Sequence, residues 1–113
     1  MIEKIVLDYL NDNLENIKAY MEHPAGKDAV SFVVLQKTGS SREDFVNRAT
    51  FAIQSYAGTL YESATLNEKV KEIMDGLAEV DRVASSKLNS DYNYTDTTSK
   101  KYRYQCVYDV VYV

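Results

Sequence analysis

The sequence predicts an α+β fold with two helices and a mostly antiparallel sheet of four to five strands, in the order α-β-β-β-α-β-β. Two segments repeat their apolar residues with the 3.6-residue period of a helix, and the others alternate with the two-residue period of a strand. The strands come in runs, without the regular helix-strand alternation of a doubly wound parallel fold. The length of 113 residues, 45% of them hydrophobic, predicts a single domain over residues 1–113.

The first predicted helix opens the chain. Its apolar residues recur three and four positions apart, so that they share one face of a helix. They are Ile2, Ile5, Val6, Tyr9 and Leu10. Leu14 is the last apolar anchor that we expect before the period changes.

Three strands are expected next. Residues 17–21 alternate as a short half-buried strand, and residues 23–28 contain the Pro and Gly of a turn. Residues 29–37 are apolar on both faces, which predicts an inner strand covered on both sides. The short connection predicts a hairpin between these two strands. Residues 48–56 form the third strand.

Residues 38–47 show neither helical nor strand periodicity and predict a polar loop. A loop of this length is expected to be mobile or engaged in binding. Ala57 and Gly58 end the preceding strand, and Thr59 followed by Glu62 fits the capping box of a second helix. That helix is expected to run to about Leu77.

The last two strands are predicted over residues 80–93 and 100–113, joined by a turn at residues 93–99. Ser85 and Ser86 suggest a bulge or a change of face in the first of them. The second places four of the ten tyrosines on one face: Tyr102, Tyr104, Tyr108 and Tyr112. This row predicts either a core packed under a helix or a subunit interface. Base stacking is a third reading, but the only cations nearby are Lys100, Lys101 and Arg103.

Composition argues against several functional classes. A net charge of −4 is unlike that of a protein that coats nucleic acid. With one cysteine and one histidine, the chain has no intramolecular disulfide and no His- or thiolate-rich metal cluster. Cys106 is expected in the core and His23 on the surface. We therefore predict no enzyme activity, no catalytic residues, no cofactor and no metal.

Two short motifs are rejected. Lys37-Thr38-Gly39 matches a β-lactamase triplet, but its partner motifs are missing. A calcium-loop-like start at Asp91 lacks the required glycine at its sixth position, which is Asp96. The N-terminus lacks the basic and apolar regions of a signal peptide, and the longest apolar runs are too short to span a bilayer. The expectation is an intracellular protein that does not engage a membrane.

Several stretches of the sequence resemble small proteins of phages and prophages of Gram-positive bacteria. The similarity lies in MIEKIVLDYL at 1–10, ATFAIQSYA at 49–57, KLNSDYNYTD at 87–96 and YRYQ at 102–105. The chain is identified by it as a member of the tail terminator group, the tail-completion or head–tail joining proteins of long-tailed phages. The likeness covers nearly the whole chain.

The resemblance implies a non-enzymatic structural role. Such proteins cap the tail tube as a ring, typically a hexamer, and join it to the head connector, so the implied partners are other copies, the tail tube protein and the connector protein. DNA only passes through the lumen, where an acidic subunit would not retain it. The implied location is the virion tail, and the host bacterial cytoplasm during assembly.

Ring contacts in this group use loops and sheet edges. Here that implies the 38–47 loop, the turn at 93–99 and a strand edge as candidate subunit or partner contacts. The residues are Gly39, Ser40, Ser41, Arg42, Glu43, Asp44, Tyr94 and Asp96. The alternative function is a small adaptor or regulatory domain that binds a host or phage protein.

Overall fold

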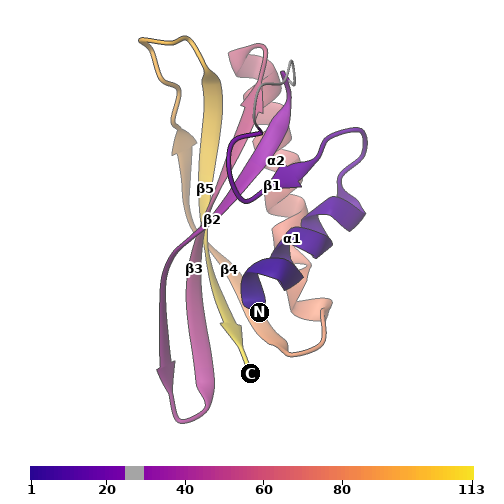
Figure 1. Cartoon of the computed structure of the whole chain (residues 1–113), viewed down its shortest axis with the longest axis vertical. Helices are drawn as coiled ribbons and strands as arrows, with labels where there is room; N and C mark the ends of the chain where they lie inside the picture. The colour runs from indigo at the N-terminus through magenta and orange to yellow at the C-terminus, as the bar shows by residue number, and fades with distance from the viewer. Residues whose placement is uncertain (25–29) are drawn as a thin grey trace.

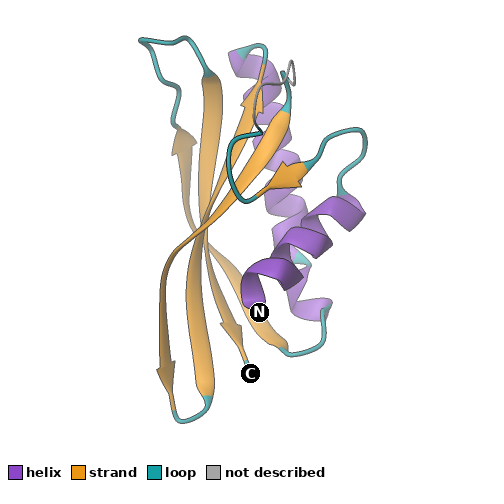
Figure 2. Cartoon of the chain, in the orientation of Figure 1, coloured by secondary structure: helices purple, strands orange, loops and turns teal. Residues whose placement is uncertain are grey.

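The structure is a computed structural model that describes residues 1–24 and 30–113. It confirms the α+β class and the order α-β-β-β-α-β-β, with all strands in one five-stranded sheet (Figures 1 and 2). The elements are α1 (Ile2–Asn13), β1 (Ala19–Tyr20), β2 (Phe32–Glu43), β3 (Val46–Ala57), α2 (Leu60–Asp75), the 3₁₀ turn η1 (Leu77–Glu79), β4 (Val83–Asn93) and β5 (Tyr102–Tyr112). Residues 25–28 of the predicted 23–28 turn, and Ala29 of the predicted second strand, lie outside the described residues.

The sheet order is β1-β2-β3-β5-β4, and every pairing is antiparallel except the first. β1 runs parallel to β2, with Ala19 opposite Val33, so the predicted hairpin between these strands is wrong. The reason lies in α1. Asn11 accepts a hydrogen bond from Ala19 N at 2.7 Å and donates one to Ala19 O at 3.1 Å. These bonds occupy the free edge of β1 and tie its direction to the preceding helix.

Both helices pack on one face of the sheet (Figure 2). α1 buries Ile2, Val6 and Leu10, as its predicted stripe requires, and Leu14 is buried after it. The sheet contributes the inward positions of its central strands to the same core. These include Val33, Leu35, Ala49, Phe51, Ile53, Cys106, Tyr108 and Val110. Phe32 and Val34 are buried on the opposite face, which confirms that the start of β2 is covered on both sides.

The capping box at the start of α2 forms as predicted. Glu62 N donates to Thr59 Oγ1 at 3.1 Å, and the Thr59 hydroxyl donates to Glu62 Oε1 at 3.0 Å. The helix ends at Asp75, slightly before its predicted end, and Gly76 leads into η1. A Cβ at Gly76 would lie 2.8 Å from the Tyr9 hydroxyl, so a larger residue here would require the Tyr9 side chain to shift.

β4 carries two register shifts against β5, one between Val83 and Ser85 and one between Leu88 and Ser90. The first lies beside the predicted irregularity at Ser85 and Ser86. Such bulges turn side chains to the other face of a strand. They explain why the few apolar residues of β4 show no simple alternation in the sequence.

The tyrosine row of β5 divides between core and partial exposure. Tyr108 is fully buried, and its hydroxyl lies 2.7 Å from Asp75 Oδ1 and 3.0 Å from the Lys71 carbonyl oxygen, both on α2. Tyr112 is half-buried against the same core, and Tyr102 and Tyr104 are half-buried. The core interpretation therefore holds for the middle of the strand.

Candidate functional site

The predicted loop at residues 38–47 is a β-hairpin, and the loop prediction is wrong. β2 continues to Glu43 and β3 begins at Val46, so only Asp44 and Phe45 form the turn. Both have positive φ, 50° and 67°, as a two-residue type I′ turn requires. We call residues 38–47 the hairpin arm. It projects from one end of a molecule whose longest extent is 44 Å (Figure 1).

The hairpin arm escapes sequence patterning because it has no buried face. All residues from Gly39 to Asp44 are exposed, so no apolar alternation marks the strand. The turn also lacks the Asn-Gly or Asp-Gly pair that normally marks such a hairpin. At its tip Phe45 is 90% exposed, although it is not among the contact residues that the sequence predicts. A lone aromatic among charged and polar residues was the available signal.

The predicted contact residues do not come together. Gly39, Ser40, Ser41, Arg42, Glu43 and Asp44 lie on the hairpin arm, whereas Tyr94 and Asp96 lie in the β4–β5 connection. Figure 1 shows the tip of the hairpin arm and this connection at opposite ends of the molecule. The structure thus offers two separate surfaces in place of one.

The β4–β5 connection is ordered by Asp96. Its carboxylate accepts hydrogen bonds from the Ser99 hydroxyl at 2.9 Å and from Thr98 N at 3.0 Å. These bonds hold the pKa of Asp96 below its usual value. Asp96 also forms an isolated β-bridge with Lys101. The connection therefore presents Lys100 and Lys101 from a defined backbone.

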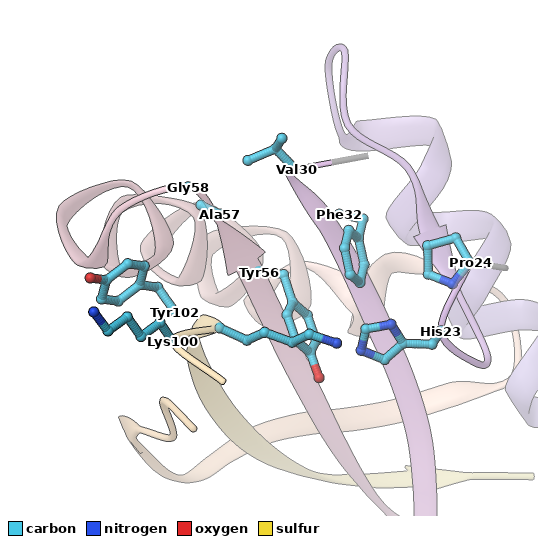
Figure 3. A pocket seen from close by; sticks show the side chains of 10 residues that line it. His23, Pro24, Val30, Phe32, Tyr56, Ala57, Gly58, Lys100 and Tyr102 are labelled. Carbon is cyan, nitrogen blue, oxygen red and sulfur yellow. The ribbon is translucent and has the colours of Figure 1, made fainter. Parts of the chain in front are cut away.

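Beside this connection lies a cavity of about 450 Å³, which we call the aromatic pocket. Its walls come from residues 23–24 after β1, residues 30–32 at the start of β2, the end of β3, and residues 100–102 at the start of β5 (Figure 3). The lining residues are His23, Pro24, Val30, Phe32, Tyr56, Ala57, Gly58, Lys100, Lys101 and Tyr102. None of them had been predicted as a site residue.

Three rings form one wall of the aromatic pocket. Phe32 and Tyr56 stack with centroids 4.6 Å apart, and His23 meets them edge to face at 5.1 and 4.8 Å. These aromatic contacts are favourable geometries. His23 is exposed as predicted, yet its ring is partly covered. That burial lowers the pKa of His23, and the positive charges of Lys101 and Arg103 lower it further.

Arg103 fixes the neighbouring aromatic side chains. Its Nη1 donates to the Tyr56 hydroxyl at 2.7 Å, and its Nε donates to the Tyr94 carbonyl oxygen at 2.7 Å. The guanidinium carbon lies 4.5 Å from the ring centroid of Tyr94 and 5.6 Å from that of Tyr56. Cation–π attraction therefore ties Tyr94, a predicted contact residue, to the rim of the pocket.

Cys106 is fully buried in the core, as predicted. Burial raises the pKa of its thiol to about 12, with a smaller contribution from the negative charge of Asp91. A thiol of that pKa is protonated at neutral pH and is a poor nucleophile. Residues 1–24 and 30–113 contain no group of three or more His, Cys, Asp or Glu side chains placed to bind a metal ion. Across these same ranges no helix is long and apolar enough to cross a membrane.

No protein-family model matches the chain, and no curated protein sequence matches it either. The arrangement is best described by its two ends. One end presents an exposed hairpin tip, and the other presents an aromatic pocket with a basic rim.

Proposed function

We propose that this protein is a non-enzymatic structural component of a bacteriophage tail. In this proposal it forms a ring, a hexamer by analogy with the tail terminator group, that caps the tail tube and joins it to the head connector. DNA passes through the lumen without being read. The protein would reside in the virion tail, and in the host cytoplasm during assembly.

The observation that carries the proposal is the hairpin arm. Its strands bury none of their side chains between Gly39 and Asp44, yet they remain fully paired to each other. A long exposed hairpin tipped by Phe45 adds no core contacts that would stabilise an isolated subunit. Exposed aromatic side chains of this kind are enriched at the centres of protein interfaces. Together with the sequence resemblance, this supports a role in assembly.

The adaptor alternative is favoured by a different observation, the aromatic pocket. Cavities of roughly 300–1,000 Å³ lined by apolar side chains with a few polar groups are typical of ligand sites. In this alternative the pocket receives a segment of a host or phage protein, and the protein regulates that partner without entering the virion.

The experiment that tests the proposed function is deletion of the gene from the phage, followed by electron microscopy of the particles. We expect tails of uncontrolled length or tails separated from heads. Restoring the gene should restore normal particles. Normal infectious particles from the deletion would contradict the structural role and favour the adaptor.

A second variant addresses the hairpin arm. Replacing residues 42–47 by Asn-Gly keeps Ser41 and Arg48 as the pair that closes the turn, in the register of the sheet. The shortened protein should fold, because the removed residues contribute little to the core, but it should not rescue the deletion. Full rescue would show that the hairpin arm is dispensable for assembly.

A further inference from the structure

The tip of the hairpin arm combines one aromatic ring with two acidic groups. Phe45 is 90% exposed, and Glu43 and Asp44 precede it. Neither carboxylate forms an ion pair within the part of the chain that the structure describes. The nearby cation, Arg42, donates from Nε to Asn47 Oδ1 at 3.0 Å, across the hairpin arm. This hydrogen bond to a neutral amide leaves Arg42 charged, so the tip carries two negative charges and one positive charge around an apolar ring.

The aromatic pocket has the complementary chemistry. Its wall of stacked rings is apolar, and Lys100 and Lys101 stand at its rim. Neither lysine forms an ion pair with a residue in the ranges 1–24 and 30–113. Glu62, which lies beside the lining residue Gly58, is hydrogen-bonded to Thr59, and Asp96 is hydrogen-bonded to the backbone and hydroxyl of its own turn. Among the described residues, no ion pair offsets the positive charge of this rim.

The tip of the hairpin arm lies at one end of the molecule, and the end of β3 and the start of β5, which line the pocket, lie at the other (Figure 1). A chain therefore cannot place its own tip in its own pocket. A second copy can. The acidic pair Glu43 and Asp44 meeting a basic rim gives charge complementarity, which fixes orientation and favours encounter. The cavity of about 450 Å³ is larger than a phenyl ring.

We propose that the tip of the hairpin arm of one copy binds in the aromatic pocket of a second copy. Phe45 contacts the exposed lining residues His23 and Val30, in front of the stacked rings, and Glu43 and Asp44 face Lys100 and Lys101. The contact joins two different surfaces, so copies associate head to tail, the arrangement that closes into a ring or continues as a filament. This proposal rests on the ring function proposed above and names the contact that would join neighbouring subunits of the ring.

Cysteine cross-linking tests the contact directly. The variant D44C/K101C places one thiol at each surface, while Cys106 stays buried and unreactive. A short bis-maleimide should give a ladder of covalent dimers, trimers and larger species on a denaturing gel. The matched control D44C/K87C places the second thiol on the exposed Lys87 of β4. A ladder no stronger than that control, at the highest soluble concentration, would overturn the proposal.

The head-to-tail geometry can also be tested without cysteines, by mixing two variants that each have one of the two contact surfaces disrupted. F45A removes the ring from the tip, which should weaken association by about thirtyfold. K100E/K101E reverses the charge of the rim. Each variant alone should remain monomeric, but an equal mixture should form heterodimers and nothing larger, because only one intact contact remains. Mass measurement by light scattering reads this out. Larger species, or no heterodimer, would contradict the proposal.

The proposed contact and the proposed function fail separately. If the cross-linked ladder is absent while the deletion phage has abnormal tails, the ring role stands and this contact is wrong. If the ladder forms but the deletion phage is normal, the contact stands and the tail role is wrong.

Discussion

At the residue scale, the turn of the hairpin arm places an unfavourable backbone conformation at the tip. Phe45 has a φ of 67°, in the left-handed region that disfavours residues with a Cβ. Asp44 beside it has a φ of 50°, which Asp and Asn tolerate better. A turn optimised for the isolated chain would carry Asn-Gly here. The presence of Phe45 at this position therefore favours a role for its side chain in contact with another molecule.

This conflict gives the first prediction. D44N/F45G should raise the free energy of unfolding by about 1 kcal/mol, because glycine adopts positive φ without a steric cost. Urea denaturation measures the change. F45A is the matched control, since it removes the ring but keeps the strained Cβ and should not be more stable. A less stable D44N/F45G would mean that the Phe45 ring stabilises the hairpin arm itself.

The second prediction concerns pH and His23. Its folded-state pKa is lowered, so the unfolded chain binds the proton more readily than the folded chain. Stability should therefore fall as pH drops below about 6.5, the ordinary histidine value, through the lowered folded pKa. Partial burial of the ring is the largest cause of this lowered pKa, and the positive charges of Lys101 and Arg103 lower it further. Thermal melts at pH 7 and 5.5 measure it.

H23Q is the control for that experiment, because glutamine has no titrating group in this range. It should have a smaller change in melting temperature between the two pH values than the natural protein. An equal change in both proteins would assign the effect to other groups.

At the scale of elements, the parts of the fold that the sequence predicts are those with a buried face or a local signal. The stripe of α1 and the Thr59–Glu62 box carry such a signal, and both are confirmed. The strand at 48–56 is confirmed too, but its predicted polar face is wrong, because Phe51 to Ala57 are buried on both faces. The hairpin arm has no buried face, and the direction of β1 depends on two hydrogen bonds from Asn11. Features of this kind leave no periodic pattern of apolar residues in the sequence.

The candidate site is harder still to predict, because it is assembled from distant positions. His23, Phe32, Tyr56 and Lys101 belong to four separate segments, and only the sheet order places them around one cavity. The sequence predicts Tyr94 and several polar residues as contacts, but it does not indicate Phe45 at one end or the rings of His23, Phe32 and Tyr56 at the other. In the sequence, the aromatic residues at the pocket resemble ordinary core residues, and Phe45 is a single aromatic residue within a polar stretch.

The third prediction concerns the α2 cap. T59A removes the side chain that accepts a hydrogen bond from Glu62 N, and it should lower the free energy of unfolding by about 1 kcal/mol. T59S keeps the hydroxyl and should remain close to the natural protein. Chemical denaturation of both variants checks this. Equal stability of all three proteins would mean that the cap contributes nothing measurable.

At the scale of the whole molecule, charge is distributed unevenly between the two ends. The chain has a net charge of −4, so copies repel each other on average. The basic rim of the aromatic pocket is a local exception to that average. Association through this rim must overcome the general repulsion, so orientation decides whether two copies attract.

The fourth prediction follows from this distribution. The rim and tip charges are exposed and act across short distances, so salt should screen their attraction. Raising ionic strength from about 0.05 to 0.5 M should weaken head-to-tail association of the natural protein. Sedimentation equilibrium measures the dissociation constant. The swap E43K/D44K/K100E/K101E should retain the same salt dependence. Association that strengthens with salt would instead indicate an apolar contact.

The inequality of the two ends has one more consequence. A ring whose neighbouring copies meet through unlike surfaces has only rotational symmetry about its axis, so its upper and lower rims cannot be alike. Every hairpin arm would run in the same sense around the circumference. Such an object has a top and a bottom fixed by each subunit, and it can receive one kind of partner on one side and another kind on the other.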